Sequence, residues 1–222
     1  MVRGPRIAVI DSGVYAEHPH IQGVAGGVGV DDFGVLHGDY VDRLGHGTAV
    51  TAVIREKAPT AEIWAVRVFD RELTATGLAL VTALQWARSH GVHLINLSLG
   101  TTNPQHEAAL KEQVEQSRTA GIAIVCAAPQ EGCRWLPGAL GGVIRVTADL
   151  SIGRDAYEVS LDRNGDVTMT ASGYPRPIPG VPPEKNLKGT SFAVANATGL
   201  LARAWPTWPD WMRAHVDAGG HE

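Results

Sequence analysis

Three short motifs, far apart in the chain, contain the residue types of one catalytic arrangement. They are Asp11-Ser12-Gly13, His46-Gly47-Thr48 and Gly189-Thr190-Ser191. Together they supply a carboxylate, an imidazole and a hydroxyl. A serine hydroxyl becomes an effective nucleophile when an imidazole removes its proton, and a carboxylate holds that imidazole in the required tautomer. The order Asp, His, Ser is one of the chain orders known for such a triad, so acyl transfer is the chemistry these residues could perform.

Each motif also has an ordinary structural explanation when taken alone. Asp and Gly are common in turns, and Thr48 could simply cap a helix. The neighbouring sequence favours the catalytic interpretation. An apolar run that predicts a buried strand ends at Asp11, and apolar runs that predict helices begin at His46 and Ser191. Strand ends and helix starts meet at one edge of an open α/β sheet, which is where ligands bind.

The elements that must position these residues alternate along the chain. The predicted strands are Arg6–Ile10, Glu62–Phe69, His93–Ser98, Ala123–Ala127 and Val143–Thr147. The predicted helices are His46–Arg55, Gly77–Ser89, Gln105–Ala120 and Ser191–Ala204. Such repetition is typical of a mostly parallel sheet flanked by helices on both faces, so we expect an α/β fold, a three-layer sandwich. The 222 residues show no internal repeat or linker, and we expect a single domain over residues 1–222.

Four further segments stand out by composition. Asp155 to Met169 predicts an antiparallel hairpin. The Gly-rich run from Gly23 to Gly29 predicts a mobile loop, and the Pro-rich run from Tyr174 to Pro183 predicts an extended surface loop. Trp205 and Trp208 predict a packed C-terminal cap, with binding of a partner as the alternative.

The three motifs together resemble those of the subtilisin-like serine proteases, the subtilases. The matching stretches include Gly45–Thr48 and Gly189–Ala193, and the resemblance extends over nearly the whole chain. It implies a subtilisin-like fold and a serine endopeptidase that works through an acyl-enzyme. In the implied mechanism Ser191 attacks the peptide carbonyl, His46 transfers the proton and Asp11 orients His46.

The resemblance also implies a site for the substrate backbone. Ser98, Leu99 and Gly100 follow a predicted strand, as do Ala127 and Ala128, and in relatives such residues pair with the substrate and line its specificity pocket. Main-chain hydrogen bonds to an exposed strand suit an extended peptide of any sequence. The alternative is an ordinary buried strand followed by a Gly turn.

The main departure from the family pattern lies at the residue expected to stabilise the oxyanion. Relatives read Ala-Ala-Gly-Asn, whereas this chain has Pro129 before Gln130. Losing the Asn donor costs roughly 100- to 1000-fold in kcat, a magnitude measured in this same family. Gln keeps the carboxamide but reaches about 1.5 Å further, the length of one C–C bond. Three alternatives stay open: Gln130 fills the oxyanion hole, another donor joins the Ser191 N–H, or the site is weak or inactive.

Composition limits the partners. The net charge is −4 without a long basic run, so we expect a peptide or protein substrate and no nucleic acid. No stretch of about 18 apolar residues predicts a membrane span. Without an apolar signal segment we expect a cytoplasmic protein, or a secreted one if the sequence begins at a mature boundary. Restraint of a cytoplasmic protease by a partner protein is one option.

No cofactor is expected, and no metal site is predicted. His18 and His20 lack a neighbouring Cys or carboxylate cluster, while Asp31-Asp32 and Asp39–Asp42 leave a calcium site open. Cys126 and Cys133 are expected to be reduced thiols in a cytoplasmic protein, with a local disulfide as the alternative.

Two other functions compete with a broad endopeptidase. The first is a processing protease or transpeptidase dedicated to one peptide of a biosynthetic pathway. The second is a peptide-binding pseudoprotease, which the replacement of the usual Asn by Gln130 motivates.

Overall fold

One sheet organises the structure, a computed structural model that describes residues 4–70, 72–73, 75–130 and 132–217. Within these residues the sheet has nine strands in the order β3-β2-β4-β1-β5-β6-β7-β9-β8. They are β1 (Arg6–Asp11), β2 (Gly26–Val30), β3 (Leu36–His37), β4 (Glu62–Arg67), β5 (Leu94–Leu97), β6 (Ala123–Ala127), β7 (Ile144–Asp149), β8 (Tyr157–Leu161) and β9 (Val167–Ser172). All neighbours pair in parallel except β2 with β3 and β8 with β9, which are antiparallel. The mostly parallel sheet predicted from the sequence is therefore confirmed.

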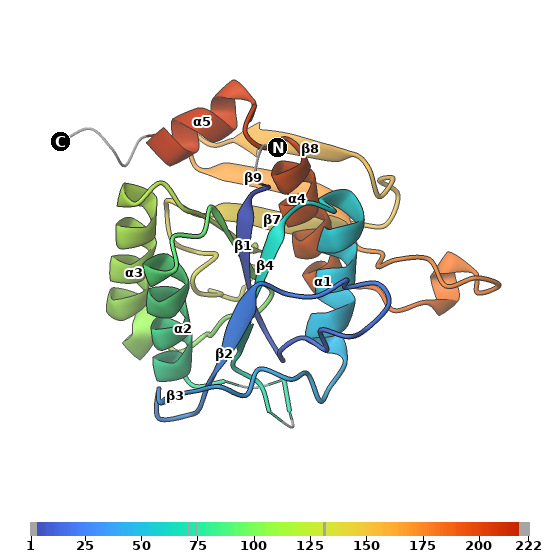
Figure 1. The fold of residues 1–222 in the computed structure, drawn as a ribbon. Helices are drawn as coiled ribbons and strands as arrows, with labels where there is room; N and C mark the ends of the chain where they lie inside the picture. Colours follow the sequence, from blue (N-terminus) through green and yellow to red (C-terminus); the bar gives the residue numbers. More distant parts are fainter. Residues whose placement is uncertain (1–3, 71, 74, 131, 218–222) are drawn as a thin grey trace.

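Helices cover both faces of this sheet (Figure 1). They are α1 (His46–Lys57), α2 (Gly77–Ser89), α3 (Glu107–Thr119), α4 (Thr190–Arg203) and α5 (Asp210–Asp217), with 3₁₀ turns at Pro104–His106 and Pro183–Lys185. The predicted helix Gln105–Ala120 therefore begins as a 3₁₀ turn. No helix of the described chain is long and apolar enough to span a membrane.

The central strand β1 shows how its side chains divide between the two layers. Ile7 and Val9 pack with α1 and α4, whereas Ala8 and Ile10 pack with α2 and α3. Successive side chains of a strand point to opposite faces, and a strand buried on both faces reads as a continuous apolar run. The same alternation turns Asp11 toward the face that α1 and α4 cover.

The Gly-rich run from Gly23 to Gly29 is not the loop that we expected, because most of it forms β2. A Cβ on Gly26 would lie 2.7 Å from the ring of Trp64. A Cβ on Gly27 would lie 2.5 Å from the backbone oxygen of Ala65 and 2.7 Å from the ring of Tyr40. These glycines allow neighbouring groups to approach a strand closely, which is a second use of Gly besides flexibility.

The hairpin and the C-terminal cap agree with expectation. β8 and β9 pair around a turn in which the Asp162 carboxylate accepts the N–H groups of Asn164 and Asp166. Trp208 is buried and donates its indole N–H to the Leu201 carbonyl at 2.8 Å. Its ring meets Trp205 edge to face. The tryptophans thus pack the C-terminal segment onto α4.

Candidate active site

The three residues of the predicted triad stand at the ends of elements that meet at one edge of the sheet. Asp11 is the last residue of β1 and is fully buried. His46 is the first residue of α1, and Ser191 is the second residue of α4, which packs along α1. Ser98 follows β5, the neighbour of β1, and its hydroxyl lies 3.4 Å from the backbone oxygen of Ser191. This edge is the carboxyl end of the parallel strands, where α/β folds place ligands.

Asp11 and His46 are joined directly. Nδ1 of His46 lies 2.7 Å from Oδ1 of Asp11, and the same oxygen accepts the Ser12 N–H at 2.7 Å. A proton on Nδ1 that points to the carboxylate leaves Nε2 with its lone pair. The arrangement therefore supplies an imidazole in the tautomer that can accept a proton.

The pKa of His46 is raised above its usual value by its acidic neighbours. Burial alone would lower this pKa, but the hydrogen bond and charge of Asp11, followed by the charge of Asp42, more than offset burial. The two carboxylates stabilise the imidazolium, the state that a general base reaches once it has taken a proton.

The helix that carries Ser191 packs against the helix that begins at His46. The ring of Phe192, the residue after Ser191, lies 6.0 Å from the imidazole, measured between centroids. Among the described residues, no hydrogen bond joins the Ser191 hydroxyl to His46. Hydrogen bonds of this kind are often long in a free site and tighten around the substrate. The structure thus links Asp11 and His46 directly and packs the helix of Ser191 against that of His46.

A cavity of about 340 Å³ adjoins the nucleophile position. We refer to it as the β5–β6 cavity; it is lined by Ser98, Ala127, Ala128, Gln130, Cys133, Trp135 and Thr190. It therefore brings together three of the predicted substrate-binding residues and the predicted oxyanion residue. Leu99 is buried beneath the surface, and Gly100 lies against Trp135, where a Cβ would meet the indole nitrogen at 2.5 Å. Neither of the two lines the cavity.

Gln130 is one of the residues that line this cavity. Its side chain is exposed, and its backbone oxygen accepts the Cys133 N–H at 2.9 Å. Both cysteines are free thiols. Burial raises the pKa of Cys126 to about 12, so this thiol is unreactive at neutral pH. The turn is closed by backbone bonding between Gln130 and Cys133.

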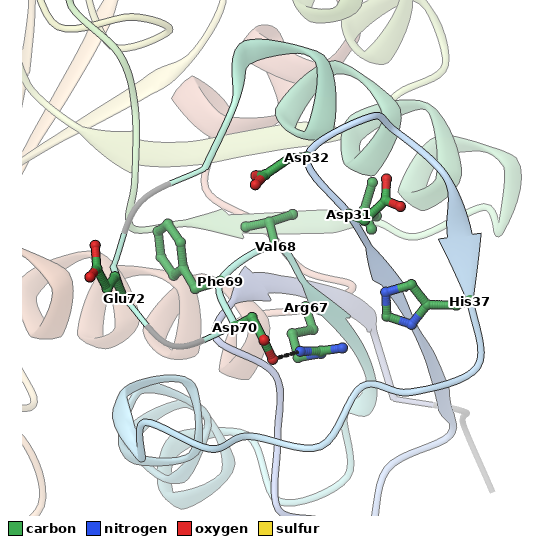
Figure 2. A pocket seen from close by; sticks show the side chains of 9 residues that line it. Asp31, Asp32, His37, Arg67, Val68, Phe69, Asp70 and Glu72 are labelled. Atoms are coloured by element: carbon green, nitrogen blue, oxygen red, sulfur yellow. Dashed lines mark hydrogen bonds and ion pairs between the residues drawn. The ribbon is translucent and has the colours of Figure 1, made fainter.

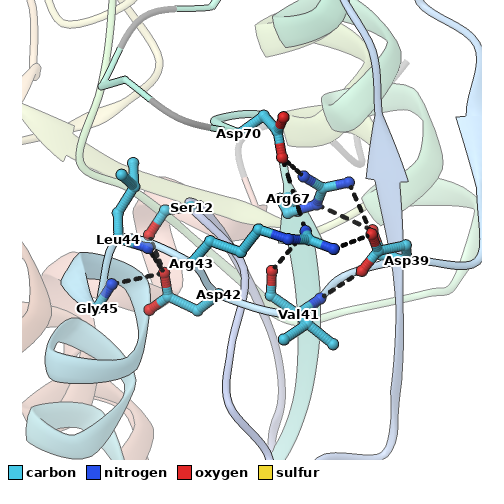
Figure 3. A network of polar contacts seen from close by, with 9 residues as sticks. All are labelled: Ser12, Asp39, Val41, Asp42, Arg43, Leu44, Gly45, Arg67 and Asp70. Carbon is cyan, nitrogen blue, oxygen red and sulfur yellow. Dashed lines mark hydrogen bonds and ion pairs between the residues drawn. The ribbon is translucent and has the colours of Figure 1, made fainter.

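Asp42 is a residue whose role sequence reasoning missed (Figure 3). Its Oδ1 accepts the Ser12 hydroxyl and the N–H groups of Leu44 and Gly45. Its Oδ2 accepts the N–H and the hydroxyl of Thr48, at 2.8 and 2.6 Å. An Asp shortly before a helix start is the available signal, because such side chains bind the free N–H groups of a first turn. The aspartate fixes the start of α1 and hence the position of His46.

Three of the acidic residues considered for calcium, Asp31, Asp39 and Asp42, have other partners. Asp39 binds Arg43 and Arg67 (Figure 3). Asp31 lines a 390 Å³ hollow beside β2 and β4 (Figure 2), and its Oδ1 accepts the backbone N–H groups of Phe33 and Val35. In the part of the chain that the structure describes, no three His, Cys, Asp or Glu side chains gather closely enough to hold a metal ion.

Comparison with known proteins identifies relatives of this fold. A thermostable alkaline protease of Halalkalibacterium halodurans is 29% identical over 96% of this chain and 60% of its own length. Subtilisin E of Bacillus subtilis is 27% identical over 95% of this chain and 58% of its own length. The chain thus spans about three fifths of the length of each of these two relatives.

Solved structures share the same architecture. Sphericase superposes with a TM-score of 0.69 at 22% identity, covering 97% of this chain and 81% of its own. The prenylagaramide maturation protease PagA superposes with a TM-score of 0.65 at 23% identity, covering 96% and 82%. The protease domain of PatA has the same TM-score and identity, covering 96% and 86%. The fold is therefore subtilisin-like.

The sequence profile of the Subtilase family matches residues 2–218, which is nearly the whole chain. With this match and the shared fold, we conclude that the chain belongs to the Subtilase family.

Proposed function

We propose that this protein is a serine endopeptidase with the triad Asp11, His46 and Ser191. The observation that carries the proposal is the 2.7 Å contact between His46 Nδ1 and the buried Asp11 carboxylate, at the start of a helix that packs against the Ser191 helix. Membership of the Subtilase family supports the same chemistry. The substrate is a peptide or protein.

In the proposed reaction, the Ser191 hydroxyl attacks the peptide carbonyl while His46 Nε2 takes its proton. The resulting imidazolium then donates this proton to the leaving amine, which departs and leaves an acyl-enzyme. Water, deprotonated by His46, then attacks the acyl carbonyl; the bond to the Ser191 oxygen breaks, and His46 returns the proton to that oxygen. Asp11 stays ionised throughout, orienting the ring and stabilising its charge.

The oxyanion is held by the Ser191 N–H and by the carboxamide of Gln130. Support comes from the β5–β6 cavity, which Gln130 lines together with Thr190, the residue before the nucleophile. An exposed side chain on a turn can swing toward the developing charge. A fixed donor there is worth several kcal/mol in this family, about 3–4 kcal/mol for the usual Asn.

The strand ends beside the nucleophile hold the substrate backbone. We assign this role to Ser98, Leu99 and Gly100 after β5, and to Ala127 and Ala128 at the end of β6. For Ser98, Ala127 and Ala128, this role is supported by their position in the lining of the β5–β6 cavity. Leu99 and Gly100 contribute backbone groups, since their side-chain positions lie away from the cavity.

Labelling with a fluorophosphonate probe tests the triad. The probe reacts with an activated serine, and we expect one adduct, on Ser191, that is absent from Ser191→Ala and strongly slowed in His46→Ala. A correctly folded wild-type protein that forms no adduct on Ser191 would leave only the peptide-binding pseudoprotease.

A dedicated processing protease or transpeptidase is the second candidate. The fold shared with a prenylagaramide maturation protease favours it. Casein digestion separates the two, because a broad endopeptidase degrades casein and a dedicated one does not. Adding an amine nucleophile to a cleaved peptide substrate then shows whether the acyl-enzyme is transferred to amine or to water.

A further inference from the structure

A second hollow lies on the other flank of the proposed site. It has a volume of about 390 Å³ and opens between the segment after β1, the start of α1 and the segment before α4. We refer to it as the α1 pocket. Figure 1 shows both segments beside α1, the first in blue and the second in orange. Gly45, which precedes His46, lines this pocket, and so does Leu187, four residues before Ser191.

The walls of the α1 pocket carry exposed apolar side chains. Tyr15 and Ile178 are each 49% exposed, and Leu187 is 64% exposed. Large apolar side chains gathered around one hollow are a feature of binding sites rather than of ordinary protein surface.

The rim of the same pocket carries two imidazoles and one guanidinium, from His18, His20 and Arg176. The rings of the two histidines meet edge to face at 5.0 Å. The charge of Arg176 is the main cause that lowers the pKa of His20, followed by burial and by His18, which places the three groups within electrostatic reach.

The nearby carboxylates are already engaged. Asp42 lines the pocket, but its oxygens accept hydrogen bonds from Ser12, Leu44, Gly45 and Thr48. Glu56, which also influences His20, forms an ion pair with Arg154. In the described part of the chain no carboxylate pairs with the Arg176 guanidinium. A half-buried guanidinium without a partner is suited to bind a carboxylate from a ligand.

The position of the pocket indicates which part of a ligand it receives. The β5–β6 cavity is lined by the strand ends to which the proposed reaction assigns the substrate backbone, and we take it to receive the acyl side of the peptide. The leaving amine takes its proton from His46, the first residue of α1. The peptide segment that follows this amine therefore lies next to the start of α1. The α1 pocket borders that helix at Gly45, Thr48 and Ala49.

We infer that the α1 pocket binds the leaving-group side of the peptide substrate, and that it selects a segment with an apolar side chain next to a carboxylate. Arg176 pairs with the carboxylate, while Tyr15, Ile178 and Leu187 contact the apolar side chain. The inference rests on the proposed function and adds a substrate class to it.

Matched peptides test this selectivity. They share one acyl side and a leaving segment of Leu followed by Asp, Asn or Lys, each made as a C-terminal amide. The Leu-Asn peptide is also made with a free C-terminal carboxylate, which separates a side-chain carboxylate from a terminal one. We expect kcat/KM to be about tenfold higher for Asp than for Asn, the size of one charge-assisted hydrogen bond.

Substitutions of Arg176 supply the second half of the test. Arg176→Gln should reduce the preference for Asp over Asn to less than about twofold, and Arg176→Glu should favour Lys. Arg163→Gln is the matched control, since it removes the same charge from the exposed β8–β9 turn. An unchanged preference for Asp in Arg176→Gln, or equal rates for Asp and Asn in the wild type, would overturn the inference.

Two further measurements separate this inference from the proposed function. Fluorophosphonate labelling of Ser191 needs no leaving segment, so labelling of the wild type reports on the triad independently of the α1 pocket. Binding of the Leu-Asp and Leu-Asn segments to Ser191→Ala, measured by calorimetry, needs no catalysis. Failure of labelling in the wild type would contradict the triad, whereas equal binding of both segments would contradict the role of the pocket.

Discussion

The carboxylate of Asp42 accepts both the backbone N–H and the hydroxyl of Thr48, at 2.8 and 2.6 Å. The proposed triad uses His46 as its base. His46 stands between the two in the chain. The hydroxyl of Ser12, next to Asp11, donates to the same carboxylate, and its oxygen accepts the Gly47 N–H. Asp42 therefore ties the segment that carries the acid to the segment that carries the base.

Asp42→Asn should move the acid limb of the pH–rate profile to lower pH. The activity rises as His46 loses its proton, and the charge of Asp42 raises the pKa of His46, so removing that charge lowers this pKa. The midpoint of the limb in kcat/KM is measured, with Glu158→Gln on the exposed face of β8 as the charge control. A limb that stays in place or moves to higher pH would show that Asp42 does not act on His46.

Asp11→Asn should lower kcat by about 10⁴-fold while the protein stays folded. The amide presents a donor where the carboxylate accepted, so the imidazole is held in the tautomer that cannot take the serine proton. Hydrolysis of an activated ester measures the loss, and thermal unfolding checks the fold. Wild-type turnover in a folded variant would remove Asp11 from the mechanism.

Gln130→Ala should lower kcat at least about tenfold, because the oxyanion loses its side-chain donor. Gln130→Asn should be tolerated only together with Pro129→Gly, since the shorter amide needs a different backbone path. Steady-state kinetics of the single and double variants measure both effects. Unchanged turnover in Gln130→Ala would exclude this residue, and a fully active Gln130→Asn single variant would refute the coupling with Pro129.

Gly27→Ala should destabilise the protein by about 1–3 kcal/mol, because the new methyl group meets a backbone oxygen and the Tyr40 ring in β2. Gly38→Ala is the matched control, since a Cβ there meets nothing within 4 Å. It should be neutral or slightly stabilising. Urea unfolding of the two variants gives the comparison, and equal stability would mean that β2 is not packed as described.

Local patterns in the sequence predicted the central strands and the main helices well. Ile7 to Ile10 read as a buried strand because a parallel strand covered on both faces needs apolar side chains at every position. The β2 strand could not be predicted from apolar side chains, because its glycines have none. Their role depends on Trp64, Tyr40 and His37, which approach from other segments.

The candidate site also combines features that are local in the sequence with features that arise only in the folded chain. The types of Asp11, His46 and Ser191, and the elements at whose ends they stand, were readable from the sequence, since motif and periodicity are local properties. The tertiary structure decided that Asp42 fixes the start of α1 and that Leu99 does not line the β5–β6 cavity. It also decided that no carboxylate of the described residues pairs with Arg176. Each of these depends on which distant groups come within a few ångströms, and the chain sets those distances only when it is folded.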